Sequence, residues 1–299
     1  VDSEEQHGKL GAIVAIESLI DLEQEMHPQM GTRFANYVNS FIRRSDSGAE
    51  HQESVVAAVA ALGKLVKADM GIPADMVEDA ISNALDWIRK DAEKFEELRR
   101  RRFAAVHVLR QLAVDSPTHF YVQVIREVDI KDSFLEVMWG VLCDKSETIR
   151  RTTASALGSC LEMVAQREGD HCRELYRGVY EQALVHLGST NDAEVHGALL
   201  AMCQLVVIPH AMDEYVSDNL QPLALVLFAK IKEHRDVVVR HQFLQLLPAL
   251  HKSPAIDEVT KIDGTLIYLM ELLRKGEFRG PAFIALGELA AARRDIQGQ

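Results

Sequence analysis

Histidine and cysteine are the side chains of this sequence that could hold a metal ion or act as nucleophiles. The 299 residues include 12 histidines and four cysteines, Cys143, Cys160, Cys172 and Cys203. Zinc sites use these residue types at short, characteristic spacings, and neither H-E-x-x-H nor C-x-x-C occurs here. His171 and Cys172 are adjacent, which places them on different faces of a helix. We therefore expect no metal site, and we expect the cysteines to be free buried thiols of a reducing compartment.

Motifs for phosphate binding and for nucleophilic catalysis are also absent from the sequence. It contains no G-x-x-x-x-G-K-[ST], G-x-G-x-x-G or G-x-S-x-G, and no H-R-D-x-x-x-x-N or D-F-G. Acidic residues do cluster, at Glu96, Glu97, Asp144 and Glu147, but they precede expected helices, where negative charge complements the helix dipole. The sequence predicts no catalysis, no cofactor and no small-molecule ligand within this chain.

Basic residues show a more regular spacing, set by a recurring five-residue frame. The frame occurs as AIESL, ALGKL, VLRQL, ALGSC, AMCQL, LLPAL and ALGEL. Its second residue, the anchor, falls at positions 16, 62, 109, 157, 202, 247 and 286, so that successive separations are 46, 47, 48, 45, 45 and 39. Seven residues before the anchors stand Lys9, Val55, Arg102, Arg150, Val195, Arg240 and Arg279. Five of these seven residues are basic.

This period predicts an all-α chain built from HEAT repeats. A repeat of about 40–47 residues with two helices is typical of HEAT and armadillo proteins, and the regular basic residue favours HEAT. Hydrophobic residues make up 47% of the chain and aromatic residues 6%, a composition that suits helix–helix packing. We expect a HEAT-repeat α-solenoid of about six and a half helical hairpins, forming one continuous array over residues 1–299.

The apolar periodicity and the Pro and Gly positions predict where helices begin and end. We expect a turn at His27–Thr32, a break at Asp129–Asp132, a bend or early end at Pro248, and a last helix that begins near Pro281. The expected helices are Glu4–Leu22, Arg33–Arg44, Glu50–Ala68, Ala74–Lys90, Phe95–Val114, Thr118–Leu142, Glu147–Gln166, Cys172–Leu187, Ala193–Val207, Asp213–Ile231, Asp236–Leu250, Ile256–Arg274 and Glu277–Arg294.

The basic residues fall into two groups, the repeated positions and the run at 99–102, and each group has its own interpretation. At the repeated positions we expect a structural ladder between repeats, with the arginines paired to carboxylates of neighbouring units through bidentate hydrogen bonds. Arg99 and Arg100 belong to the densest basic run of the chain, and Arg100 lies on a polar helix face. They are either part of a solvated face or a contact for an acidic partner protein.

The overall charge and hydropathy exclude two classes of function. The net charge of −12 disfavours nucleic-acid binding, which requires a basic surface. No apolar run approaches the 18–20 residues of a membrane span. The chain starts with Val and ends within a helical pattern, so we expect it to be part of a longer protein. Broad protein–protein contacts are the expected function of such a surface.

Several longer motifs form an ordered set along nearly the whole chain. The longest is Arg101–Phe120, which fits R-R-x-A-A-V-x-V-L-R-x-L-A-x-x-x-P-T-x-F. The others lie at Gly11–Leu19, Arg33–Tyr37, Ile149–Leu161, Gln166–Glu168, His196–Leu200, Leu246–Pro248 and Ala282–Gly287. In these motifs and their order, the chain resembles the N-terminal HEAT region of the target-of-rapamycin (TOR) Ser/Thr kinases. The segment 122–136 matches poorly, and 207–235 is shorter than in some relatives.

The resemblance implies a parent protein that controls growth in response to nutrients and carries its kinase domain elsewhere. It also implies that this region is scaffold, which supports a dimeric complex and contacts a Raptor-type subunit. The implied location is the cytoplasm, with access to lysosomal or vacuolar membranes through partners. An independent HEAT adaptor, of the nuclear-transport or phosphatase-scaffold type, is the alternative that the repeats alone leave open.

Overall fold

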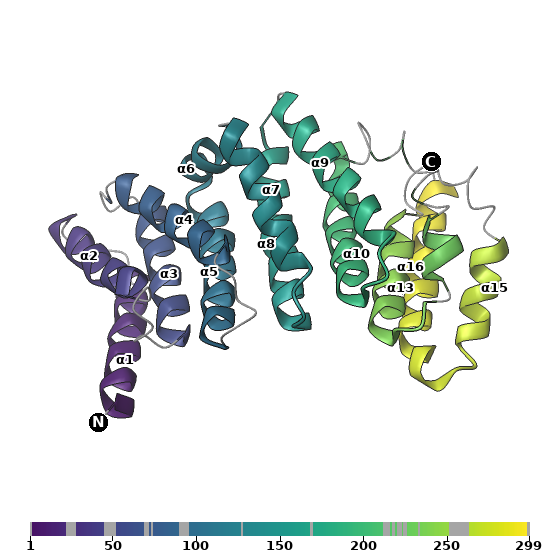
Figure 1. Ribbon diagram of the computed structural model, residues 1–299, viewed down its shortest axis with the longest axis horizontal. Coiled ribbons are helices and arrows are strands. Elements are labelled where there is room, and N and C mark those ends of the chain that lie inside the picture. The colour runs from purple at the N-terminus through teal and green to yellow at the C-terminus, as the bar shows by residue number, and fades with distance from the viewer. Residues whose placement is uncertain are drawn as a thin grey trace. The chain divides into compact units, whose positions relative to one another are not determined.

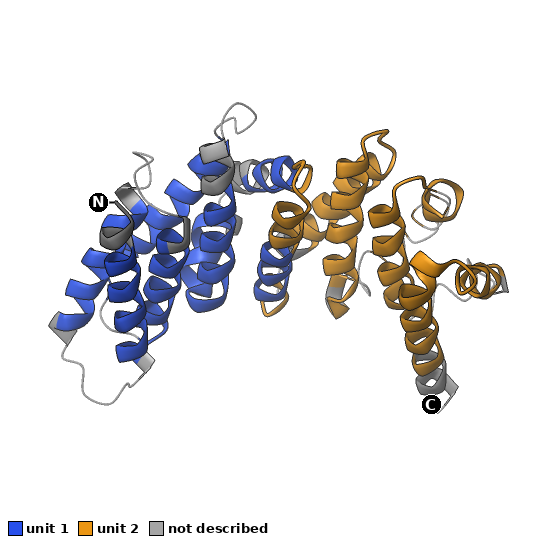
Figure 2. Cartoon of the chain, turned by 90° about the horizontal axis from the view of Figure 1, so that it is seen from below, with its two compact units in different colours: residues 1–141, 155–163 blue, residues 142–154, 164–299 orange. Residues whose placement is uncertain are grey.

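The computed structural model is all-helical in the residues that it describes. These are 2–21, 28–44, 52–68, 72, 74–89, 96–126, 128–167, 170–211, 216, 219, 223, 226–232, 234–250 and 263–297. Side chains at several helix ends lie outside the described part, including those of Arg99 and Arg100. The chain divides into two compact units, residues 1–141 with 155–163, and residues 142–154 with 164–299 (Figure 2). A single continuous array over residues 1–299 stays a prediction.

Unit 1 is a stack of antiparallel helices. It contains α1 (Asp2–Asp21), α2 (Pro28–Arg44), α3 (Gln52–Lys67), α4 (Ala74–Arg89), α5 (Glu96–Asp115), α6 (Pro117–Phe120), the π-helical turn η2 (Tyr121–Arg126) and α7 (Val128–Leu142). Helix α2 packs on α3, and α4 packs on α5. The second helix of each pair stacks on the next, α1 on α3 and α3 on α5 (Figure 1). This is the arrangement that the repeat period predicts.

Unit 2 repeats the same plan. It includes both ends of α8 (Glu147–Ala165), whose central residues belong to unit 1. The other elements of unit 2 are α9 (Asp170–Leu187), α10 (Asp192–Val206), α11 (Pro209–Ala211), the π-helical turn η5 (Leu227–Ile231), α13 (Val237–Leu250), α15 (Asp263–Leu272), the 3₁₀ turn η6 (Gly276–Phe278) and α16 (Arg279–Gln297). Within pairs, α9 packs on α10 and α15 on α16; between pairs, α10 packs on α13 and α13 on α16. Among the described elements, the pairs α2–α3, α4–α5, α9–α10 and α15–α16 thus follow the two-helix repeat that the sequence predicts.

The hydrophobic core follows the anchor positions. Six of the seven anchors are buried: Ile16, Leu62, Leu109, Leu157, Met202 and Leu247. Leu286 in α16 is partly exposed. Each anchor lies on a second helix, so its burial results from the stacking of one second helix on the next. The phase of the repeat is therefore confirmed for the first six units.

Two expectations about helix ends were wrong, the turn at His27–Thr32 and the break at Asp129–Asp132. Helix α2 starts at Pro28 rather than at Arg33, whereas α16 starts at Arg279, near Pro281 as expected. Both prolines lie in a first turn, where the N–H groups have no intrahelical partner and the missing donor costs little. Helix α7 begins at Val128, so it includes the residues of the expected break. Helix α13 includes Pro248 and extends to Leu250, so it does not end early, and a bend at Pro248 stays a prediction. Residues 213–215 and 256–262 of two predicted helices lie outside the described part.

Asp and Asn side chains explain why the second helices start where they do. Asn191 Oδ1 accepts the N–H of Ala193 at 3.0 Å, and Asp236 Oδ1 accepts that of Val239 at 2.9 Å. These bonds satisfy N–H groups that lack an intrahelical acceptor. Asp144 Oδ1 accepts the N–H of Ser146 at 2.8 Å in the turn before α8. Among the described helices, none has both the length and the apolar composition required to cross a membrane.

Candidate functional site

The five basic residues of the predicted ladder all lie near the start or middle of second helices. Lys9 is partly exposed on α1, and Arg102 is partly exposed on α5. Arg150 on α8 is only 7% exposed. Arg240 on α13 is partly exposed and Arg279 on α16 is exposed. The same repeat position therefore occurs in environments that range from core to solvent.

Three of these arginines reach forward to the next repeat. Arg102 donates to the carbonyl oxygen of Gly140 at 3.3 Å. Arg150 Nε donates to His196 Nδ1 at 2.9 Å. The guanidinium carbon of Arg240 lies 4.0 Å from the centre of the Phe278 ring, a cation–π geometry. At all three ladder positions the arginine contacts the following repeat, but the group that it contacts differs: a carbonyl, an imidazole or an aromatic ring.

The predicted carboxylate partners are wrong for Arg150, Arg240 and Arg279 in the described part of the chain. Two of these arginines bind main-chain carbonyls that follow a first helix. Arg150 donates to the carbonyl oxygens of Asp144 and Lys145 at 2.7 and 3.0 Å, and Arg279 donates to that of Leu273 at 3.1 Å. These carbonyls belong to the turns that follow α7 and α15, and buried main-chain carbonyls require a donor. The arginine fork satisfies these carbonyls, so it needs no carboxylate.

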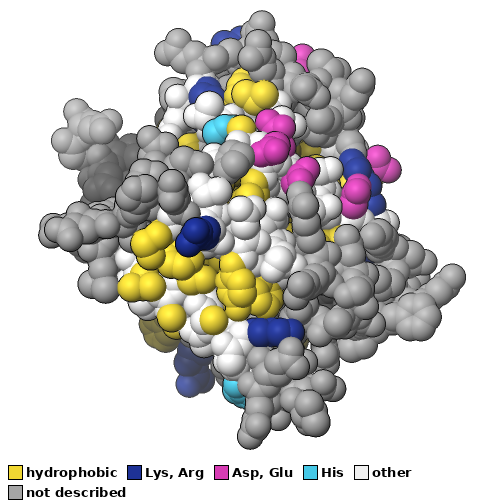
Figure 3. Space-filling view, turned by 90° about the vertical axis from the view of Figure 1, so that its left-hand side faces the viewer, with side chains coloured by type: hydrophobic (Ala, Val, Ile, Leu, Met, Phe, Trp, Pro, Cys, Tyr) yellow, Lys and Arg dark blue, Asp and Glu magenta, His cyan; other side chains and the backbone are white. Residues whose placement is uncertain are grey.

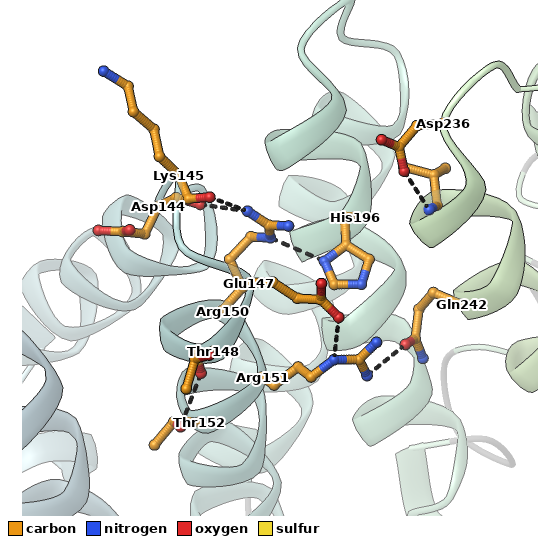
Figure 4. Close-up of polar contacts among 11 residues, drawn as sticks. Asp144, Lys145, Glu147, Thr148, Arg150, Arg151, Thr152, His196, Asp236 and Gln242 are labelled. Carbon is orange, nitrogen blue, oxygen red and sulfur yellow. Dashed lines mark hydrogen bonds and ion pairs between the residues drawn. The ribbon is translucent and has the colours of Figure 1, made fainter.

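Arg150 and His196 form the buried centre of a polar cluster (Figure 4). His196 is 1% exposed on α10. Because Nδ1 accepts a hydrogen bond from Arg150, the ring is neutral and carries its proton on Nε2. Burial, and then the charges of Arg150 and Arg151, lower the pKa of His196 to about 4. Burial also lowers the pKa of Arg150, against the opposing effect of Glu147 and Asp144.

Arg151, the next residue, extends the cluster to a third helix. Its Nε donates to Glu147 at 2.8 Å, and its NH1 group donates to Gln242 Oε1 at 3.2 Å. Gln242 is 3% exposed on α13, and its Nε2 donates to Cys203 Sγ at 3.2 Å. Burial raises the pKa of Cys203 to about 11. Side chains from α8, α10 and α13 therefore meet in one cluster, whose residues we name the polar cluster: Glu147, Arg150, Arg151, His196, Cys203 and Gln242.

The sequence pattern singled out Arg150 as a ladder residue, but it did not predict that the other members of the polar cluster gather around it. A usable signal was present, because Arg150-Arg151 is a double basic step at the ladder position and His196 follows the equivalent position of the next repeat. Gln242 carries no such signal. Its role depends on a side chain 91 residues away, and helical periodicity contains no information on that distance.

A second group, Cys143, His186 and Glu194, has the residue types of a nucleophilic site but not its geometry. Cys143 Sγ lies 3.8 Å from His186 Nδ1, and Glu194 Oε2 lies 3.4 Å from the same atom. A catalytic relay requires the nucleophile and the acid to use different ring nitrogens. Burial and the charge of Glu194 raise the pKa of Cys143 to about 12. This arrangement holds a thiol, not a reactive thiolate.

Apolar side chains are exposed on one end of unit 1. Hydrophobic side chains gather on this face (Figure 3), and the large exposed ones of α1 and α2 are Val14, Leu19, Met30 and Tyr37. In unit 2, Ile267, Met270, Phe283 and Ile284 of α15 and α16 are 57–63% exposed. Exposed apolar groups of this kind are typical of protein-interaction surfaces. The side chains of Arg99 and Arg100 lie outside the described part, so their proposed partner contact stays a prediction.

The chain is similar in sequence to several TOR-type protein kinases. It is 30% identical over 285 residues to the Serine/threonine-protein kinase TOR of Oryza sativa subsp. japonica, a match that covers 94% of this chain and 11% of that protein. It is 29% identical over 293 residues to the Serine/threonine-protein kinase tor1 of Schizosaccharomyces pombe, covering 98% of this chain and 12% of that protein. No family model matches the chain.

The fold has a counterpart among solved structures. Kap121p, in its crystal structure bound to RanGTP, matches with a TM-score of 0.61 and 15% sequence identity, over 95% of this chain and 28% of that one. At this identity the likeness concerns the helical-repeat fold alone. The sequence match is the stronger finding, because its identity is 29% to 30%, against 15%, over a similar share of the chain. The chain belongs to the target-of-rapamycin family of Ser/Thr protein kinases, as a helical-repeat region that corresponds to 11% to 12% of the length of these relatives.

Proposed function

We propose that this chain is a protein-binding scaffold region of a TOR-type kinase that signals nutrient supply and growth. The observation that carries the proposal is the sequence match to named Ser/Thr kinases over 94% to 98% of the chain. The helical-repeat fold supports a scaffold role, since stacked repeats offer extended surfaces. The parent protein is then a kinase in which the catalytic domain lies outside these residues.

The proposed scaffold role involves binding a specific partner subunit and supporting the assembly of a larger complex. We infer that this region contacts a Raptor-type subunit and supports dimerisation of the complex, in the cytoplasm and at endomembrane surfaces reached through partners. Exposed apolar side chains at Val14, Leu19, Met30 and Tyr37 support a role in protein contacts. Arg99 and Arg100 are the proposed electrostatic contact, because they belong to a basic run on a chain of net charge −12.

Co-purification of the Raptor-type subunit with the full-length kinase tests this proposal. The variant Arg99→Glu/Arg100→Glu should recover less subunit than the wild type, and the deficit should be larger at low salt because salt screens exposed charges. The matched control is Arg173→Glu/Arg177→Glu, which makes the same charge change at exposed positions of α9 and should leave recovery unchanged.

Two other results would contradict parts of the proposal. Equal recovery by both variants and the wild type at low and high salt would remove Arg99 and Arg100 from the interface. A wild-type kinase that purifies without any Raptor-type subunit would contradict the assembly role itself. The purified chain should also fail to bind ATP in calorimetry, and saturable binding at micromolar concentration would contradict the assignment of this region as scaffold alone.

A further inference from the structure

The bond between Arg151 and Gln242 departs from the usual contact rule of repeat proteins. In a stacked array each repeat contacts its immediate neighbours. Arg151 lies on α8 and Gln242 lies on α13, and the whole pair α9–α10 separates them in the sequence. Their side chains are nevertheless hydrogen-bonded at 3.2 Å. Two repeats that are not neighbours are therefore joined directly.

The geometry at Gln242 fixes both ends of this connection. Its Oε1 accepts from Arg151 on α8, and its Nε2 donates to Cys203 on α10. The amide of Gln242 is thereby held in one orientation. Arg151 is held in turn by Glu147, one helical turn earlier, at 2.8 Å. Figure 4 shows Arg151 between Glu147 and Gln242.

Helix α10 lies in the middle of this connection and is unusually enclosed. Every residue from Val195 to Met202 is buried, although an ordinary surface helix has an exposed face. His196 is the one polar side chain in that stretch that can ionise, and Arg150 binds it at 2.9 Å. Adjacent residues of α8 therefore hold the two following second helices, Arg150 holding α10 and Arg151 holding α13.

We propose that the polar cluster is a clamp that fixes the spacing of three consecutive repeats, with the Arg151–Gln242 bond as the part that opens. The two arginines differ in access to solvent. Arg150 is 7% exposed, whereas the Arg151 side chain is 43% exposed. Water or an anionic partner group can reach Arg151 and compete for its guanidinium, while the Arg150–His196 bond stays closed. Opening at Arg151 frees α13 from α8 and leaves α8 folded.

Hydrogen–deuterium exchange of the full-length protein tests the clamp. The variant Arg151→Met should raise the exchange rate of amides in the first half of α13, about threefold or more, while α8 keeps its protection, since exchange reports local opening. Gln242→Leu should raise exchange in the same part of α13. The double variant should add little to either single change, because both remove the same bond.

A control outside the polar cluster separates the clamp from ordinary helix stabilisation. Arg89→Met removes an arginine paired within its own helix, to Asp86 at 3.1 Å, and should leave α13 unchanged. The proposal is overturned if Arg151→Met alters exchange only in α8, alters it equally in all helices, or alters it nowhere, or if the effects of Arg151→Met and Gln242→Leu on α13 are additive.

Discussion

Helices α10 and α16 are second helices of equivalent repeats, yet they differ in how completely their neighbours enclose them. In α10, Leu199 is fully buried, while Phe283 at the equivalent position of α16 is 60% exposed. The ladder arginines differ in parallel. Arg150 on α8, beside α10, donates to two preceding carbonyls and also to His196, whereas Arg279 on α16 donates to the preceding carbonyl of Leu273.

This difference shows that the ladder arginine makes two kinds of contact, one backward and one forward, which contribute separately to stability. The backward bond to the turn after the first helix is local, and it is made by Arg150 in the repeat of α8 and by Arg279 in the repeat of α16. The forward contact depends on the next repeat. Packing of that repeat excludes water from the arginine guanidinium, so the groups that the arginine binds have no other donor. Leaving a buried partner unsatisfied costs more than losing a hydrogen bond at the surface. We therefore expect the same substitution to have unequal effects in the two repeats.

The largest effect should come from Arg150→Met. This change leaves the carbonyls of Asp144 and Lys145 and the Nδ1 atom of His196 without their donor. We expect the free energy of unfolding to fall by about 3–4 kcal/mol, as for a buried charged group whose partners remain. Urea unfolding followed by circular dichroism measures it. A loss below about 1 kcal/mol, the size of a surface contact, would contradict the buried role of Arg150.

Glycine substitutions sharpen the comparison next. A Cβ atom at Gly197 in α10 would overlap the main-chain carbonyl oxygen of Leu142, whereas one at Gly287 in α16 would meet nothing within 4 Å. We expect Gly197→Ala to destabilise the chain by about 2–3 kcal/mol through forced movement of backbone. Gly287→Ala should stabilise it by up to about 1 kcal/mol, since Ala is the better helix former. Equal melting temperatures for the two variants would contradict the difference in enclosure.

Acid should weaken the enclosed region through His196. Its pKa is about 4 in the folded chain and about 6.5 when unfolded. Between these values the unfolded state binds a proton that the folded state does not, so the free energy of unfolding falls as pH decreases from 6.5 to 4, by about 3 kcal/mol in total. The variant His196→Gln should show a shallower decrease over this range. An unchanged pH slope would show that His196 is not the group responsible.

The smallest effect should come from Arg279→Met. Arg279 is exposed, and its bond to Leu273 can be replaced by water. We expect a loss below about 1 kcal/mol in the same urea experiment that is used for Arg150→Met. If Arg279→Met were as damaging as Arg150→Met, the backward bond alone would carry the energy, and enclosure by the next repeat would not matter.

The sequence predicts the helices of this chain far better than the contacts of its polar side chains. Apolar periodicity and the anchor spacing are local signals, and they place Leu62, Leu109 and Leu157 correctly in the core. The start of α2 at Pro28 was missed because a proline is compatible with both a turn and a first helical turn.

The partners of the ladder arginines could not be predicted for a different reason. Charge composition suggests a carboxylate for each arginine, whereas unsatisfied carbonyls occur at every helix end and leave no mark in the residue types. The link from Arg151 to Gln242 also depends on how three helices are spaced. That spacing arises from the packing of helices that lie far apart in the sequence, such as α10 on α13, so no short segment of sequence contains it.

A double-mutant cycle on Arg150 and His196 tests most directly whether the forward contact carries the energy of the ladder position. The free energies of unfolding of the wild type, Arg150→Met, His196→Leu and the double variant are compared at pH 7. We predict a coupling energy of about 1–3 kcal/mol, because each single change leaves a buried polar partner behind. Additive effects, with a coupling energy below about 0.5 kcal/mol, would contradict a stabilising role for the Arg150–His196 bond. The contribution of Arg150 to stability would then come from its bonds to the carbonyls of Asp144 and Lys145.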